Sequence, residues 1–279
     1  MFLGSAIIVF REVLEAALVV GIVMAGSKGV AGRGLWVGSG VTAGVLGAGM
    51  VAVFAGTIAA AAAGMGQELF NAAILFVAVG MLGWHCVWMG RHGRDIARHV
   101  SEVSNAVAAG SRPLYALAVV VGLAVVREGS EVVLFLYGIA AGSGAGALSL
   151  LLGGIVGLVA GAALGAILYF GLLRIPTRHL FAVTTWMIVL LAAGMASQGA
   201  RFLVQADILP ALGRNIWNSS GVLSESSIPG RILHTLVGYD SSPSGIQLLF
   251  YAATLAIIGC LTYMYGRQSS PAASAARAA

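Results

Sequence analysis

The sequence has few charged residues for its length. Asp, Glu, Lys and Arg make up 9% of 279 residues, whereas soluble domains carry roughly a quarter. The hydrophobic fraction is 59%, and there are 40 glycines. This composition excludes an ordinary soluble domain. It predicts an all-α, polytopic integral membrane protein that is surrounded by the lipid bilayer.

Cysteine is also scarce. The two cysteines, Cys86 and Cys260, both lie in apolar runs, where a small packing residue is the expected role. The sequence therefore indicates no redox chemistry. No Ser/His/Asp or Cys/His set is expected at one depth of the membrane, so we predict that the protein is not an enzyme.

Seven apolar runs reach the length of about 20 residues that crosses about 30 Å of hydrocarbon. They lie near residues 3–26, 35–62, 68–90, 114–141, 147–173, 179–208 and 246–266. The first run lacks the basic flank of a secretory signal, so we expect it to be retained as a span. The whole chain, residues 1–279, is expected to form a single transmembrane domain.

Basic residues are unevenly distributed between these runs. Ten of the fifteen lie in alternate connections and in the tail: Lys28, Arg33, Arg91, Arg94, Arg98, Arg112, Arg174, Arg178, Arg267 and Arg277. The positive-inside rule therefore predicts an external amino terminus, an external loop at 209–245 and a cytoplasmic tail at 267–279, in the inner (cytoplasmic) membrane. The net charge of +5 reflects this topology, and we expect no nucleic-acid partner.

Two of the spans nevertheless contain charges in a shared pattern. Arg-Glu-x-x-Glu occurs twice, 116 residues apart, and its residues are Arg11, Glu12, Glu15, Arg127, Glu128 and Glu131. Because each ionised side chain costs at least about 2.5 kcal/mol at bilayer depth, the pattern indicates function. Three spans separate the copies, which predicts two inverted three-helix repeats, near 3–90 and 114–208, plus a seventh helix at 246–266.

Glycines support this pairing of the repeats. The fifth run has a glycine at every fourth position from Gly153 to Gly165, and the second run has Gly40 and Gly44. Glycines at this spacing let the backbones of two helices approach closely. We therefore expect close helix packing along both runs.

The acids of each motif lie three residues apart, on one face of a helix. Antiparallel spans that face each other would bring Glu12 level with Glu131. The same register would bring Glu15 level with Glu128, with Arg11 and Arg127 as supporting charges. Such a group of carboxylate oxygens suits a hard cation, although charge alone does not choose its valence.

A structural alternative is that each arginine pairs with an acid of its own helix. Arg11 and Glu15 are four residues apart, as are Arg127 and Glu131, which is the spacing of an ion pair on one helix face. This alternative leaves Glu12 and Glu128 without a partner, and it does not explain why the pattern occurs twice. We therefore favour a transport site.

The paired "REVLE" (11–15) and "REGSE" (127–131), in a seven-span chain of this length, resemble the oxidase-dependent iron permease family. This family includes the fungal high-affinity iron permease and the bacterial EfeU-type iron permeases. The resemblance extends through "QELF" (67–70), "WHCVWM" (84–89) and "LVGYD" (236–240). One departure is Val13, where the family commonly has glycine, as at Gly129.

The resemblance implies iron import, with iron as the transported substrate and not as a permanently bound cofactor. It implies that the iron-coordinating acids are Glu12, Glu15, Glu128 and Glu131. It also implies partners, namely an external cupredoxin-like protein and a haem peroxidase or ferroxidase. A permease for another hard cation such as manganese or lead, a proton-coupled carrier and an iron-sensing membrane receptor are the alternatives.

Other polar residues carry smaller predictions. Glu68 and Asp207 lie at corresponding ends of the two repeats and are either an entry site for cations or ordinary helix-end acids. Arg201 is expected inside the membrane, with no partner assigned. His85 is expected to be a hydrogen-bonded packing residue and not a ligand. The loop at 209–245 is expected to hold an outer amphipathic segment, with apolar residues Ile232, Leu233, Leu236 and Val237 at helical spacing.

Overall fold

The computed structural model describes residues 2–62, 67–143, 146–171, 177–213, 215–224 and 227–267. All regular elements in these ranges are helices: α1 (Phe2–Gly26), α2 (Arg33–Ala62), α3 (Gln67–Ala108), α4 (Tyr115–Ser143), α5 (Ala147–Tyr169), α6 (Thr177–Gln205), α7 (Ile228–Val237) and α8 (Gly245–Arg267). The prediction of an all-α protein is confirmed.

Five of these helices are long and apolar enough to cross a membrane. The apolar stretches are Arg33–Thr57, Glu68–Trp88, Ala147–Tyr169, Ala182–Gln205 and Gly245–Met264, in α2, α3, α5, α6 and α8. Helices α1 and α4 have comparable lengths of 25 and 29 residues. They differ from the other five because each carries the three charged residues of one motif.

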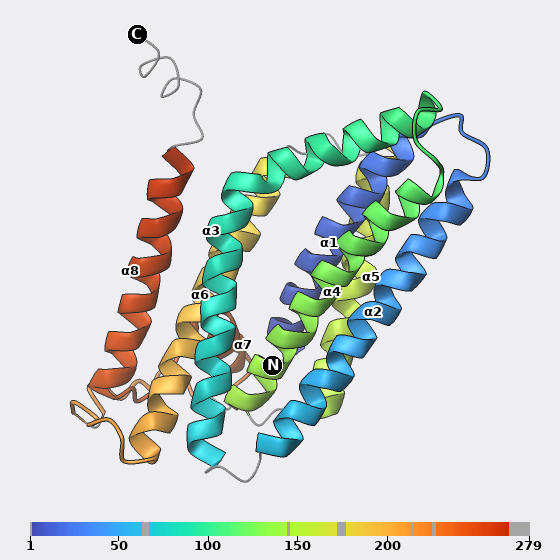
Figure 1. Ribbon diagram of the computed structural model, residues 1–279. Helices are drawn as coiled ribbons and strands as arrows, with labels where there is room; N and C mark the ends of the chain where they lie inside the picture. Colours follow the sequence, from blue (N-terminus) through green and yellow to red (C-terminus); the bar gives the residue numbers. More distant parts are fainter. Residues whose placement is uncertain are drawn as a thin grey trace.

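The two motif helices lie side by side at the centre of the bundle and run in opposite directions (Figure 1). Helix α5 packs along α1, and α2 packs along α4. Helices α3 and α6 pack against each other, and α8 contacts both of them. Each motif helix is thus covered mainly by a helix from the other half of the chain.

Glycines permit these close helix pairs, as the sequence predicts. Gly153, Gly157, Gly161 and Gly165 are all buried on α5. A Cβ atom added at Gly161 would lie 2.7 Å from the Phe10 carbonyl oxygen on α1, and one added at Gly40 would lie 2.6 Å from the Ala118 carbonyl oxygen on α4. Larger residues at these positions would force the backbones apart.

The same contacts explain the departure at Val13. A Cβ atom at Gly161 would lie 3.0 Å from the Val13 Cβ, so the larger residue on α1 faces a glycine on α5. On the other pair the sizes are reversed, because a Cβ atom at Gly129 would lie 2.6 Å from the Ala48 Cβ on α2. Val13 is accommodated because its partner helix supplies the missing space.

Helix α3 departs from the prediction of a span followed by a loop at residues 91–112. The helix continues to Ala108 and bends across one end of the bundle (Figure 1). Its second half carries an apolar stripe at Ile96, Val100 and Val107, which packs against Val23 and Leu117. The helix persists because this stripe has helical spacing; a search for long apolar runs overlooks it among the surrounding charges.

The predicted amphipathic segment is present as α7, but it does not lie over the helix ends. It contacts α6 and α1, and its capping residue Gly238 has a φ of 69°. A Cβ atom at Gly194, well inside the apolar stretch of α6, would lie 2.7 Å from the Gly238 Cα. The chain after α6 therefore folds back between the helices. Sequence spacing does not report such a glycine contact, and the external side of the segment stays a prediction.

Hydrogen bonds fix the chain that follows α7. The Tyr239 hydroxyl donates to the Leu223 carbonyl at 2.9 Å, and the Gln247 amide donates to an Asp240 carboxylate oxygen at 3.1 Å. The His234 Nδ1 lies 2.7 Å from the Tyr239 carbonyl oxygen. The "LVGYD" stretch thus anchors the segment between α6 and α8.

Candidate metal site

Helix α1 buries the first motif almost completely. The side chains of Arg11, Glu12 and Glu15 are 2%, 0% and 4% exposed. Glu12 and Glu15 share a helix face because they are three residues apart, and Arg11 reaches this face because it lies four residues from Glu15. The long apolar sequence on either side keeps the helix regular through the charged stretch. The charges are therefore held in the interior of the bundle.

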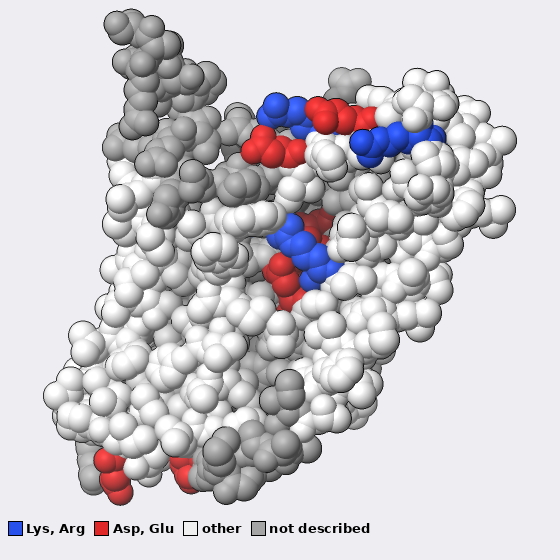
Figure 2. All heavy atoms as spheres, viewed as in Figure 1, with Lys and Arg blue, Asp and Glu red and all other residues white. Residues whose placement is uncertain are grey.

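The second motif is less enclosed. The Glu128 and Glu131 side chains are 8% and 16% exposed, and that of Arg127 is 32% exposed. The Arg127 guanidinium lies over the Trp88 ring of α3, 4.2 Å from its centroid. Figure 2 shows blue and red atoms part-way along an otherwise largely uncharged face. The cluster therefore approaches the surface on the α4 side.

Each arginine contacts both acids of its own motif. Arg11 lies 3.1 Å from Glu12 and 3.0 Å from Glu15, measured between guanidinium nitrogen and carboxylate oxygen. The Arg127 Nε lies 3.7 Å from a Glu128 oxygen and 3.4 Å from a Glu131 oxygen. The predicted pairs four residues apart are both present. The expectation that Glu12 and Glu128 have no such partner was wrong, since the planar guanidinium also reaches the adjacent residue.

The acids of the two helices come together. Ligand atoms of Glu12, Glu15 and Glu128 all lie within 4.8 Å of one another, and so do those of Glu12, His85 and Glu131. The predicted partners, Glu12 with Glu131 and Glu15 with Glu128, each share a group. Glu12 belongs to both groups and lies at the centre of the cluster.

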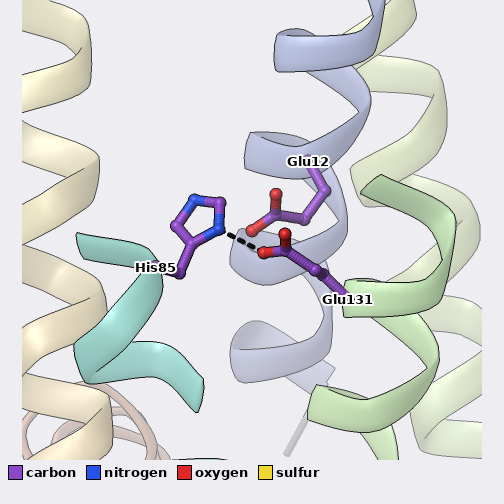
Figure 3. Close-up of side chains that lie close together, drawn as sticks. All are labelled: Glu12, His85 and Glu131. Carbon is purple, nitrogen blue, oxygen red and sulfur yellow. Dashed lines mark ion pairs between the residues drawn. The ribbon is translucent and has the colours of Figure 1, made fainter. Parts of the chain in front are cut away.

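His85 is a member of this cluster, which sequence analysis did not predict. Figure 3 shows its ring extending from α3 towards Glu131 of α4 and Glu12 of α1. Its Nδ1 forms an ion pair with Glu131, and its Nε2 lies 3.8 Å from a Glu15 oxygen. The ring is buried, as expected, but it faces acids. A polar residue within the third apolar run was the available signal, and nothing in the sequence gave its distance from the motifs.

Many polar atoms of the cluster have no hydrogen-bond partner among the described residues. They include one carboxylate oxygen each of Glu12, Glu15 and Glu128, and these three oxygens also lie in no ion pair within the described ranges. Buried acceptors without donors are costly, and native proteins have few of them. Four carboxylates and two arginines also give a formal charge of −2 when histidine is neutral. The cluster is thus suited to receive a cation.

The other predicted polar residues lie elsewhere. Glu68, in the first turn of α3, and Asp207, which follows α6 with a φ of 55°, are both exposed. Within the described ranges neither belongs to a group of three or more metal-binding side chains. Arg201 is exposed and lies in the last turn and a half of α6. It lies within the apolar stretch Ala182–Gln205, so its position inside the membrane stays a prediction.

Long apolar helices around a buried acid cluster define a multi-pass membrane protein. The sequence profile of the iron permease FTR1 family matches residues 2–267, so the chain belongs to this family.

Curated relatives agree over nearly the whole length. The ferrous iron permease EfeU of Yersinia pestis is 30% identical over 275 residues, which cover 97% of this chain and 96% of the relative. The protein of the same name from Escherichia coli O6:K15:H31 is 32% identical over 243 residues, which cover 85% and 87%. No solved structure matches this chain.

Proposed function

We propose that this protein is a permease, not an enzyme, that imports iron across the inner (cytoplasmic) membrane. The iron ion binds between α1 and α4, to the carboxylates of Glu12, Glu15, Glu128 and Glu131. One observation carries this proposal: acids from two helices far apart in the sequence converge on one buried cluster, in which three oxygens have no hydrogen-bond donor among the described residues. Membership of the iron permease family and the names of its relatives support iron as the substrate.

The cluster suits a transport site better than a pair of structural ion pairs. A structural pair is most stable when its hydrogen-bonding capacity is satisfied, whereas here three of the four acids, Glu12, Glu15 and Glu128, each have one oxygen with neither a donor nor an ion pair among the described residues. Oxygen-rich groups of this kind bind hard cations, and the bound ion replaces the missing donors. Iron is then a passing substrate and not a resident cofactor.

The proposed topology has seven spans, formed by α1 to α6 and α8, as two inverted repeats of three helices plus a seventh helix. Three features support it. Helices α1 and α4 are antiparallel, and each packs on a helix of the other repeat, α1 on α5 and α4 on α2. The Val13–Gly161 contact of the first pair also corresponds to the Gly129–Ala48 contact of the second, with the larger side chain on the other helix. Basic residues gather at the end of the bundle where α1 finishes (Figure 2), which favours an external amino terminus. A tag inserted at Ser220 should be reached by an impermeant antibody, whereas a tag after Arg267 should not.

Iron delivery is proposed to involve external partners. By resemblance to the family these are a cupredoxin-like protein and a haem peroxidase or ferroxidase. Glu68 and Asp207 remain proposed as an entry site, because both are exposed near the end of the bundle at which α3 begins and α6 finishes. Charge reversal at both positions should slow uptake most at low iron concentrations.

Radioactive iron uptake per folded molecule tests the proposal. Glu12→Gln and Glu128→Gln each remove a charged oxygen while nearly conserving the side-chain volume. Uptake should fall by roughly 10–100-fold, because substitution even of a residue that hydrogen-bonds to a metal ligand has an effect of this size. The matched control is Glu102→Gln, at an exposed position in the second half of α3, which should transport normally. Normal uptake by both motif variants would contradict the metal-site assignment.

A further inference from the structure

The partners of the buried His85 ring are acids of the two motifs. The residue is 3% exposed, and each ring nitrogen faces a carboxylate oxygen. Its nearest charged groups are Glu131, at Nδ1, and Glu15, at Nε2. A neutral imidazole has one donor nitrogen and one acceptor nitrogen. With an acid at each nitrogen, the acceptor nitrogen faces no donor, so its position requires an explanation.

Apolar packing does not provide that explanation. Other residues of α3 form its apolar packing face: Leu75, Leu82 and Cys86 belong to the main hydrophobic cluster. His85 is adjacent to this face but is directed across to α1 and α4 (Figure 3). Its ring comes from a third helix and reaches the same group of atoms as Glu12 and Glu131.

We propose that His85 is a further ligand of the transported iron, and that it gives an otherwise all-oxygen site one nitrogen donor. One ring nitrogen binds the ion through its lone pair. The other faces an acid, which fixes the orientation of the ring, as is usual for histidine ligands. This inference rests on the proposed transport of iron through the same cluster.

The nitrogen donor has a consequence for selectivity. Carboxylates alone suit magnesium, calcium and manganese, whereas imidazole suits iron and the later transition metals. A given site of nitrogen and oxygen ligands also binds ferrous iron more tightly than manganese. His85 therefore favours iron over manganese, which is one of the hard cations that a site of carboxylates alone accepts.

Competition between the two metals tests this role. Iron uptake in the presence of ascorbate should resist added manganese in the wild-type protein. In His85→Asp, which makes every ligand an oxygen, the concentration of manganese that halves iron uptake should fall roughly tenfold, the lower end of effects seen for groups around metals. His85→Gln should shift in the same direction. His234→Gln is the control, because the His234 ring contacts the Tyr239 carbonyl oxygen and not the cluster.

A second measurement does not depend on the folding of variants. X-ray absorption of the iron-loaded wild-type protein should contain the multiple-scattering signal of one imidazole ring. An all-oxygen spectrum, or unchanged manganese competition in folded His85→Asp, would overturn the role of His85. The transport site itself would still be supported if Glu12→Gln lost uptake. Normal uptake in Glu12→Gln would instead overturn the proposed function itself.

Discussion

The two copies of Arg-Glu-x-x-Glu have the same residues in different surroundings. The Arg11 side chain on α1 is 2% exposed, whereas that of Arg127 on α4 is 32% exposed and lies over Trp88. Helix α1 is contacted by α5, α3 and α7 as well as by α4. Helix α4 also has several neighbouring helices, so the exposed fractions distinguish the two motifs. The comparison teaches that the α1 copy forms the buried side of the acid cluster and the α4 copy forms its more exposed side.

The largest expected effect tests whether this difference extends to function. Glu15→Gln, in the more buried motif, and Glu131→Gln, in the more exposed one, should each reduce iron uptake by roughly 10–100-fold, because the ligand groups that contain them share Glu12. Uptake by folded protein in membranes is the measurement. If Glu131→Gln transported normally while Glu15→Gln did not, the α4 copy would be structural and the comparison would fail.

Arginine removal should separate the two copies by stability. Arg11→Met leaves two fully buried acids without their counter-charge, which should cost about 3–5 kcal/mol. Arg127→Met should cost about 1 kcal/mol, as for a partly exposed ion pair. Thermal unfolding of the purified protein in detergent measures both. Equal losses would show that exposure does not distinguish the motifs.

A smaller effect tests the size exchange around Val13. Gly129→Val places a larger residue against Ala48 and should destabilise the α2–α4 pair by about 1–3 kcal/mol. Adding Ala48→Gly recreates the Val13–Gly161 arrangement and should restore most of that loss. Gly49→Val is the control, because no atom lies within 4 Å of a Cβ added at Gly49. Failure of the double variant to recover would contradict the equivalence of the two helix pairs.

The smallest effect concerns Trp88, the aromatic neighbour of Arg127. Trp88→Leu should lower stability by about 0.5–1 kcal/mol in excess of the loss caused by the same substitution in an Arg127→Met background. A double-mutant cycle of thermal unfolding measures this coupling. A coupling energy of zero would show that the ring does not hold the exposed arginine in place.

The features that the sequence predicted are those that depend on local periodicity. Long apolar runs predicted the helices, the spacing of Glu12 and Glu15 predicted a shared face, and glycines predicted close packing along α5, though not the partner helix. Among the features that depend on the distance between helices, the meeting of Glu12 with Glu131 was predicted from the repeated motif, and others were not. The orientation of His85, the inward position of α7 and the double contact of each arginine arise from packing between segments far apart in the chain, which a single sequence does not report.

Stoichiometric iron binding to the purified protein tests most directly the claim that both motifs build one site. The wild-type protein should bind one iron ion per chain in the cluster, and Glu12→Gln and Glu128→Gln should each abolish that binding, because the two acids share one group of ligand atoms. Two ions per chain, with each variant losing one and keeping the other, would contradict the account.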